Sequence, residues 1–166
     1  MKITFLGTGT SQGVPVIACD CEVCRSPDPR DKRLRSSIMI EDEGKVIVID
    51  SGPDFRYQML RAKVKHLDAI VFTHEHKDHI AGMDDIRAFN YRQEAAIDIY
   101  ATTRVQEALR REFSYVFAEM KYPGIPEVSL HTIDLNPFIV SGIKFIPIEV
   151  MHYKLPVLGF RIGDFT

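Results

Sequence analysis

Short apolar runs alternate with polar turns along the whole chain and predict an α/β fold. Apolar and β-branched residues predict strands in the segments 2–6, 37–41, 45–50, 67–72, 97–100, 138–140 and 143–150. The segment 130–133 is interpreted as a short strand or as coil. Asp42-Glu43-Gly44 and Ser141-Gly142 are typical of hairpin turns, so each should join two neighbouring strands.

Helices are expected between some of these strands. They should cover 55–64, the segment from 84 or 85 to 94, and a segment that begins after Thr102 or Thr103. Asp54 is a suitable N-cap for the first helix, and one of the two threonines for the third. In the third helix, apolar residues recur at roughly helical spacing and indicate a face that packs in the core: Val105, Leu109, Val116, Phe117 and Met120.

The polar segment 73–79, with the sequence Thr-His-Glu-His-Lys-Asp-His, directly follows a predicted buried strand. It therefore lies at the carboxyl end of a strand, where α/β folds usually build their sites. Side chains two apart in an extended turn point the same way, so His74, His76 and Asp78 should converge, with His79 beside them. Imidazole and carboxylate ligands suit zinc, manganese or iron. The segment therefore predicts a metal site, and two ions about 3.5–4 Å apart would suit ester hydrolysis.

Three cysteines, Cys19, Cys21 and Cys24, lie within six residues. An odd number at such close spacing is a poor disulfide framework and is more typical of metal binding in a reducing compartment. Structural zinc takes four ligands in a tetrahedron. The motif therefore predicts a structural zinc site whose fourth ligand comes from elsewhere in the chain.

Composition narrows the class of protein. The 166 residues are enough for one domain with a core, so we expect 1–166 to form a single domain. Lys and Arg number 21 against 23 Asp and Glu, and the net charge of −2 argues against a non-specific nucleic-acid binder but not against a small phosphorylated substrate. No apolar run approaches the roughly 18 residues of a membrane span, so no membrane partner is expected.

The N-terminal segment gives an expectation about location. It carries one lysine and a short apolar run, and it then enters a glycine-rich turn at Gly7 instead of the longer apolar core of a signal peptide. We therefore expect a cytoplasmic protein. A homodimer is left open by the sequence.

The pattern His-x-His-x-Asp-His at 74–79 resembles the signature of the metallo-β-lactamase superfamily. The resemblance implies an αββα sandwich with a dinuclear metal site at one edge. Sandwiches of this superfamily are considerably longer than this chain. We therefore expect 1–166 to be an N-terminal portion, with the bridging carboxylate, the last His ligands and the general acid beyond Thr166.

A second motif, Gln12-Gly13-Val14-Pro15 followed by the cysteine cluster, resembles the PhnP-like phosphodiesterases of the same superfamily. In those enzymes a zinc ion away from the active site is held by such cysteines and a distant His. The resemblance implies a structural zinc ion on the three cysteines and a small cyclic phosphodiester of a sugar as substrate. The pyrroloquinoline-quinone biosynthesis B proteins carry a similar cluster, so the cluster alone leaves the substrate open.

The superfamily resemblance also implies ligand sets and a mechanism. His152 follows a hairpin at the end of a strand, where the superfamily has the third ligand of its first metal ion. The implied ligands are His74, His76 and His152 for the first ion and Asp78 and His79 for the second. Two Zn or Mn ions would activate a bridging hydroxide that attacks phosphorus, and Asp78 would orient it. Asp50, at a strand end, is expected to accept a hydrogen bond from the His cluster or to order its loop.

Two other functions remain open. A tRNase Z-like nuclease would need an extended basic exosite, which neither the charge of −2 nor any long Lys/Arg insertion supports. A quinone-biosynthesis or carrier protein would bind metal without phosphodiesterase activity. Four residues of the second helix could line the mouth of the site, although packing and solvated faces explain them better: Arg87, Phe89, Tyr91 and Arg92. His66 and His131 are interpreted as structural.

Overall fold

Side chains on the central strands alternate between two apolar layers. The computed structural model describes residues 1–120 and 122–166. Met39, Val48 and Ile70 belong to one buried cluster, which includes side chains from the helices. Their neighbours Ile40 and Ile47 belong to a second cluster, on the opposite face. Because successive residues of a strand point to opposite faces, this alternation places the sheet between two cores.

The described residues form a six-stranded sheet in the order β1-β2-β3-β4-β5-β6. Its strands are β1 Lys2–Gly7, β2 Ser37–Asp42, β3 Lys45–Ile49, β4 Ala69–Val71, β5 Ile97–Ala101 and β6 Val128–Thr132. The first three strands pair antiparallel, and β3 to β6 pair parallel. Both predicted hairpin turns, including the one at Glu43-Gly44, are confirmed.

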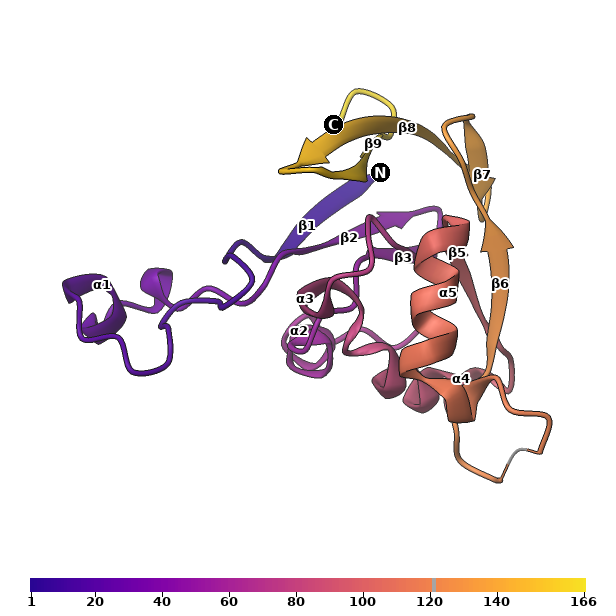
Figure 1. The fold of residues 1–166 in the computed structure, drawn as a ribbon, viewed down its shortest axis with the longest axis horizontal. Helices are drawn as coiled ribbons and strands as arrows, with labels where there is room; N and C mark the ends of the chain where they lie inside the picture. The colour runs from indigo at the N-terminus through magenta and orange to yellow at the C-terminus, as the bar shows by residue number, and fades with distance from the viewer. Residues whose placement is uncertain (121) are drawn as a thin grey trace.

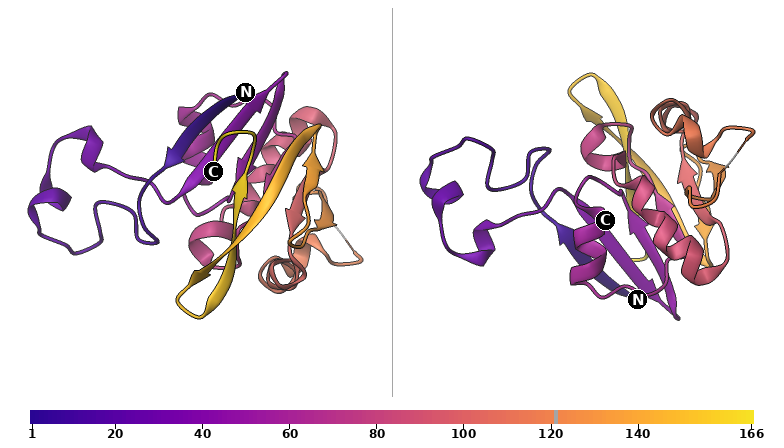
Figure 2. Two further views of the ribbon diagram at one scale, coloured as in Figure 1. Left: turned by 90° about the horizontal axis from the view of Figure 1, so that it is seen from above. Right: turned by 90° about the horizontal axis from the view of Figure 1, so that it is seen from below.

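A three-stranded sheet, β7-β8-β9 within the described residues, covers the second core. Its strands are β7 Phe138–Val140, β8 Ile143–His152 and β9 Leu155–Arg161. Phe145 and Phe160 stack edge to face in this core, with ring centroids 5.8 Å apart. The far end of the β8–β9 hairpin projects past the six-stranded sheet, as Figure 2 shows.

Helices cover the other face of the six-stranded sheet (Figures 1 and 2). They are α2 Phe55–Arg61, α3 Lys77–Ile80, α4 Arg87–Gln93 and α5 Thr103–Glu112, with the 3₁₀ turns η2 Met83–Ile86 and η3 Ser114–Val116. Helices, large sheet and small sheet are three successive layers of the predicted αββα sandwich. In the part of the chain that the structure describes, no second helical layer covers the small sheet.

The segment between β1 and β2 forms an arm that projects away from the sheets (Figures 1 and 2). It contains α1 Glu22–Arg25 and η1 Pro29–Asp31. At its base Arg33 and Val14 exchange backbone hydrogen bonds of 2.8 Å, which close the arm into a loop.

Two predicted helices end earlier than expected. The helix α2 stops at Arg61 because Lys63 adopts a left-handed conformation, and Val64 N–H then donates to the Met59 carbonyl. The helix α5 stops at Glu112, so the helical spacing no longer applies to later residues. Met120 is 91% exposed, and its expected place in the core was wrong.

One of the two expected helix caps was also wrong. Thr102 caps α5, with its hydroxyl accepting from Val105 N–H. Asp54 precedes α2 but makes no side-chain cap bond. Its carboxylate instead accepts from the backbone N–H of Arg35 at 2.8 Å and from the guanidinium at 2.9 Å. A nearby cation thus outcompetes the helix end for the carboxylate.

No helix in the described part of the chain is both long and apolar enough to span a membrane.

The exit of β3 lies very close to the segment that contains α3. Gly82 N–H donates to the Ser51 carbonyl at 2.7 Å. A Cβ atom built on Gly52 would overlap the carbonyl oxygen of Asp78. This backbone approach needs glycine because it leaves no room for any side chain.

We predict that Gly52→Ala lowers the free energy of unfolding by about 2–3 kcal/mol, because the added methyl group pushes two backbone segments apart. Urea unfolding monitored by circular dichroism measures the change. Gly159→Ala is the matched control, since a Cβ atom there meets only the Ile148 carbonyl oxygen at 3.7 Å. Equal losses of stability in the two variants would contradict the prediction.

Candidate metal centre

Three imidazoles from two distant parts of the chain meet at one end of the sheets. His74 and His76 lie in the loop after β4, and His152 ends β8. Each offers one ring nitrogen, and these three atoms lie within 4.8 Å of one another. His74 is buried, whereas the other two are exposed. The convergence agrees with the two-residue period that the sequence suggested for His74 and His76.

The β8–β9 hairpin carries His152 to the loop. Leu158 N–H in β9 donates to the Thr73 carbonyl at 3.2 Å, so the hairpin joins the start of the histidine loop through the backbone. The His152 ring then lies 5.7 Å from that of His74 and 5.3 Å from that of His76, centroid to centroid.

Asp78 and His79 form a second group beside the first. His79 Nε2 lies 3.1 Å from Asp78 Oδ2, and the His79 and His74 ring centroids are 4.0 Å apart. The six histidines of the chain thus divide into four that gather here and two that do not.

The buried carboxylate of Asp50 connects the end of β3 to this loop. It accepts from Thr73 N–H at 2.9 Å, from the Thr73 hydroxyl at 2.8 Å and from His79 Nδ1 at 2.6 Å. His79 Nδ1 is therefore the protonated nitrogen, which leaves Nε2 facing Asp78. Asp50 has a φ angle of 62°, a left-handed conformation in which its side chain turns back toward the loop.

Thr73 extends this network to His74, a role that sequence reasoning missed. The single hydroxyl proton of Thr73 goes to Asp50, so its oxygen accepts from His74 Nδ1 at 2.9 Å. His74 Nε2 is then left unprotonated. A threonine directly before a His-x-His motif was the available signal, but only the position of Asp50 reveals the connection.

The two networked histidines differ in their affinity for protons. Burial lowers the pKa of His74 to about 4, and the neighbouring charge of His79 adds to the effect. Burial opposes the charged form of His79 too, but the hydrogen bond and charge of Asp50, with a smaller contribution from Asp78, raise its pKa. His74 therefore keeps a free lone pair well below neutral pH.

The histidines line a pocket of about 460 Å³. Thr10 and Ser11 from the glycine-rich loop after β1 line its other side, together with Ser36 and Val157. Ser36 is held by its hydroxyl, which donates to the Gly9 carbonyl at 2.9 Å. The pocket thus combines imidazoles and a carboxylate with hydroxyl groups.

The donor set fits divalent metal ions. Three imidazole nitrogens at this spacing can hold one ion, and the adjoining carboxylate and imidazole of Asp78 and His79 can contribute to a second. Asp50 holds the His79 ring and Thr73 holds the His74 ring, each by a hydrogen bond to Nδ1. Histidine ligands in metal sites are usually oriented in this way, by a hydrogen bond to the ring nitrogen that does not bind the metal.

The cysteines form a separate cluster on the projecting arm. The sulfur atoms of Cys19, Cys21 and Cys24 lie within 4.8 Å of one another, and Val16 N–H donates to Cys24 Sγ at 3.3 Å. Hydrogen bonds from the Cys24 backbone and the Cys19 thiol lower the pKa of Cys21. A sulfur triad with this spacing fits zinc, and the described residues supply three of the four ligands that a structural site uses.

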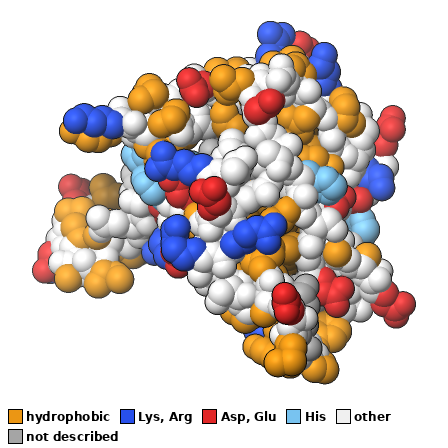
Figure 3. All heavy atoms as spheres, turned by 45° about the vertical axis from the view of Figure 1, so that its right-hand side comes forward, with side chains coloured by type: hydrophobic (Ala, Val, Ile, Leu, Met, Phe, Trp, Pro, Cys, Tyr) orange, Lys and Arg blue, Asp and Glu red, His pale blue; other side chains and the backbone are white. Residues whose placement is uncertain are grey.

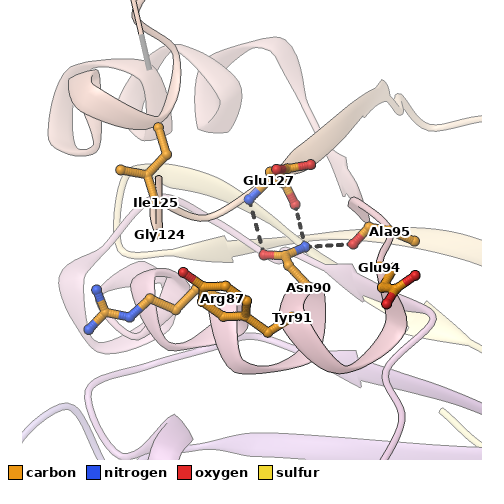
Figure 4. A pocket seen from close by; sticks show the side chains of 8 residues that line it. All are labelled: Arg87, Asn90, Tyr91, Glu94, Ala95, Gly124, Ile125 and Glu127. Atoms are coloured by element: carbon orange, nitrogen blue, oxygen red, sulfur yellow. Dashed lines mark hydrogen bonds between the residues drawn. The ribbon is translucent and has the colours of Figure 1, made fainter. Parts of the chain in front are cut away.

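The residues considered for the site mouth lie at other pockets. Arg87 and Tyr91 line a pocket with Gly124 and Glu127, and Phe89 and Arg92 line another between α2 and α4. Figure 4 shows the first of these, where the Asn90 side chain bonds the backbone of Glu127 and Ala95. Asn90 thereby connects α4 to the segment before β6 by hydrogen bonds, which is a structural role.

The two remaining histidines pair with aspartates outside the centre. His66 Nε2 lies 3.1 Å from Asp68, and His131 Nε2 lies 2.9 Å from Asp98. The His131 ring also stacks on Tyr100 with centroids 4.6 Å apart. On the face drawn in Figure 3, Lys and Arg side chains are interspersed with Asp and Glu.

Known proteins resemble this chain over its whole length. A protein named octanoyltransferase from Porphyromonas gingivalis is 45% identical over 99% of the chain, which covers 33% of that protein. A ribonuclease Z from Methanosarcina acetivorans is 29% identical over 98% of the chain, which covers 48% of it. The chain thus spans between a third and about half of these curated relatives.

A solved structure matches the chain in fold as well as in sequence. A diphosphatase from the PhnP family superposes with a TM-score of 0.89 at 42% identity, over 98% of this chain and 61% of that one. The family model described as a beta-lactamase superfamily domain matches residues 45–166, well over half of the chain. The chain therefore belongs to the metallo-β-lactamase superfamily, and within it the chain is similar to the PhnP family.

Proposed function

We propose that this protein is a dinuclear metal-dependent hydrolase that cleaves a small phosphodiester. The observation that carries the proposal is the convergence of His74, His76 and His152 beside the Asp78–His79 pair. The likeness to a PhnP-family diphosphatase supports chemistry at phosphorus. By the same likeness, a cyclic phosphodiester of a sugar is the substrate we favour.

Each residue of the centre has a proposed task. The first metal ion is held by His74, His76 and His152, and the second by Asp78 and His79, with either Zn or Mn as the metal. When bound, such ions lower the pKa of a water molecule and offset the charge on phosphate oxygens. Asp78 can also accept a hydrogen bond from the attacking water and thereby orient it toward phosphorus.

The chain's other residues prepare this chemistry. Asp50 binds Nδ1 of His79 and so keeps its Nε2 atom directed at Asp78. Thr73 binds Nδ1 of His74 and so leaves its Nε2 atom free to join His76 and His152 in holding a metal ion. Thr10 and Ser11 line the pocket with hydroxyl groups that can donate to phosphate oxygens, whereas the Ser36 hydroxyl proton is already bonded to the Gly9 carbonyl. A pocket of about 460 Å³ suits a small ester better than a polymer.

Other functions are less well supported. The ribonuclease Z relative is 29% identical, but a nuclease of this kind would favour a continuous basic surface, and the net charge is −2. Octanoyl transfer is not proposed, because that name belongs to a protein of which this chain matches 33%. A quinone-biosynthesis or carrier protein would bind the same metals without diester turnover, which the first experiment tests.

We predict that His76→Ala lowers turnover of bis(p-nitrophenyl) phosphate by more than about 100-fold. Loss of a residue that only hydrogen-bonds to a metal ligand typically costs up to about 100-fold, so loss of a ligand should cost more. The assay supplies Mn²⁺ or Zn²⁺ and includes the p-nitrophenyl monoester, which should remain inert. His131→Ala is the matched control, since His131 pairs with Asp98 away from the centre. No diester turnover by the wild type with two metal ions bound would favour the quinone-biosynthesis or carrier function.

We predict that Asp50→Asn destabilises the metal-free protein most at low pH. Asp50 raises the pKa of His79, so the pair stabilises the fold fully below the ordinary histidine pKa of about 6.5. That contribution is lost as the pH rises through the raised pKa of His79. Urea unfolding in chelator should show a loss of about 2 kcal/mol at pH 5 and a smaller loss at pH 9. Asp98→Asn is the control. A loss of stability that grows with pH would contradict the raised pKa of His79.

We predict that the protein carries one zinc ion on the cysteines in addition to the metals of the centre. Cys21→Ser should remove about one equivalent of zinc per chain, because a neutral hydroxyl replaces a thiolate ligand. Elemental analysis of the purified variant measures this, and its diester turnover with metal restored should persist. Unchanged zinc content would show that the cysteines bind none.

A further inference from the structure

The histidine loop is attached to α5 by the two residues that lie between its metal ligands, Glu75 and Lys77. His74, His76 and Asp78 point into the pocket, and the two residues between them point outward. The Glu75 carboxylate pairs with Arg104 Nε at 2.6 Å, and the Lys77 ammonium pairs with the Glu112 carboxylate. The extended residues 74–76 and the first turn of α3 therefore give metal ligands on one side and two ion pairs on the other.

The two ion pairs lie at opposite ends of the same helix. Arg104 is the second residue of α5 and Glu112 is its last, a separation of about 12 Å along the axis. The helix itself is fixed in the core by the buried side chains of Val105, Ala108 and Leu109. The loop is thus attached at two points to an element that cannot easily shift.

The two attachment residues on α5 lie at the helix ends where their own charges are unfavourable for the helix. A helix is stabilised by acidic groups near its N-terminus and basic groups near its C-terminus. Here a cation, Arg104, occupies the first turn, and no acidic residue lies there. An anion, Glu112, occupies the last position, next to the favourable charges of Arg110 and Arg111. The loop supplies the complementary order, with Glu75 near the helix N-terminus and Lys77 near its C-terminus.

His76 lies between these attachments and lacks the support that its neighbours have. His74 bonds Thr73 and His79 bonds Asp50, whereas within residues 1–120 and 122–166 no hydrogen bond to the His76 ring is found. The ring is also exposed. Its direction therefore depends on the backbone path of Glu75 to Lys77.

We propose that Arg104 and Glu112 are positioning residues, which fix the loop from Glu75 to Lys77 and so direct His76 toward His74 and His152. The inference rests on the metal centre of the proposed function, and it identifies α5 as a support for the histidine loop. Arg104 also lines a pocket with His76 and His152, so it lies next to the ligand that it positions. Arg104 and Lys77 are mostly exposed, so each pair contributes modestly and is weakened by salt.

The first test measures the affinity for the metal alone, without turnover. Arg104→Met and Glu112→Gln should each weaken binding of Zn²⁺ to the histidine centre by about two- to fivefold in competition with a chelating dye. Arg110→Met is the matched control on the same helix, because Arg110 lies over the Phe117 ring instead of the loop. The Cys21→Ser background removes the second zinc site from the titration.

Co²⁺ in place of Zn²⁺ reports ligand geometry directly. Its visible absorption bands should change in Arg104→Met and stay unchanged in Arg110→Met, although both variants should melt at similar temperatures without metal. A purely stabilising surface ion pair would change the melting temperature and leave the Co²⁺ spectrum as it was.

Two further experiments test the positioning role even if one variant folds poorly. One exchanges the charges of Glu75 and Arg104, and the other varies the NaCl concentration. Glu75→Arg or Arg104→Glu alone should weaken Zn²⁺ binding, and the two together should restore it to within about twofold of the wild type. Raising NaCl to 0.5 M should weaken binding in the wild type more than in Arg104→Met. Wild-type affinity in every α5 variant would overturn the positioning role alone, whereas a wild type that binds no metal at the histidines would overturn the proposed function too.

Discussion

The hydrogen bonds of the buried Asp50 carboxylate are the interaction on which the rest of the centre depends. One carboxylate binds the backbone and hydroxyl of Thr73 and the Nδ1 atom of His79, and through Thr73 it sets the direction of His74. It thereby joins the ends of two parallel strands, β3 and β4, and determines which ring nitrogens remain free. A charged group this well satisfied can be buried at small cost, and it gives the loop one preferred arrangement.

Packing around Asp50 makes this arrangement rigid. Gly52 allows the exit of β3 to lie directly against the backbone at Asp78. On the other side, β9 joins the loop by the bond from Leu158 to Thr73, which carries His152 to the centre. The two ion pairs to α5 complete the support. In the function that we propose, the chemistry belongs to bound metal ions, and the fold contributes the fixed directions of their ligands.

Much of the local structure followed from the sequence. Alternating apolar residues and glycine turns predicted most of the strands, although not β9, and both hairpin turns. Thr102 was one of the two threonines expected to cap α5, because a cap acts within the next turn. Helix ends were predicted less well. Lys63 ends α2 in a conformation that usually needs glycine, and Asp54 pairs with Arg35, which lies 19 residues earlier. Neither outcome is visible in a local pattern, because each depends on a neighbour brought there by the fold.

The sequence by itself determined the type of chemistry and part of its geometry. His74 and His76 share a side because an extended chain repeats every two residues, and the cysteines lie close because only a few residues separate them. Asp78 was expected to follow the same repeat, but it lies in α3 and reaches the pocket from the first turn of that helix. The superfamily resemblance implied His152 as a ligand, and His66 and His131 were interpreted as structural, but only the tertiary structure brings His152 to this cluster. Tertiary structure alone revealed that Thr73 links Asp50 to His74. The physical reason is range: periodicity fixes directions over a few residues, whereas contacts across tens of residues exist only once strands have paired and the two sheets have packed.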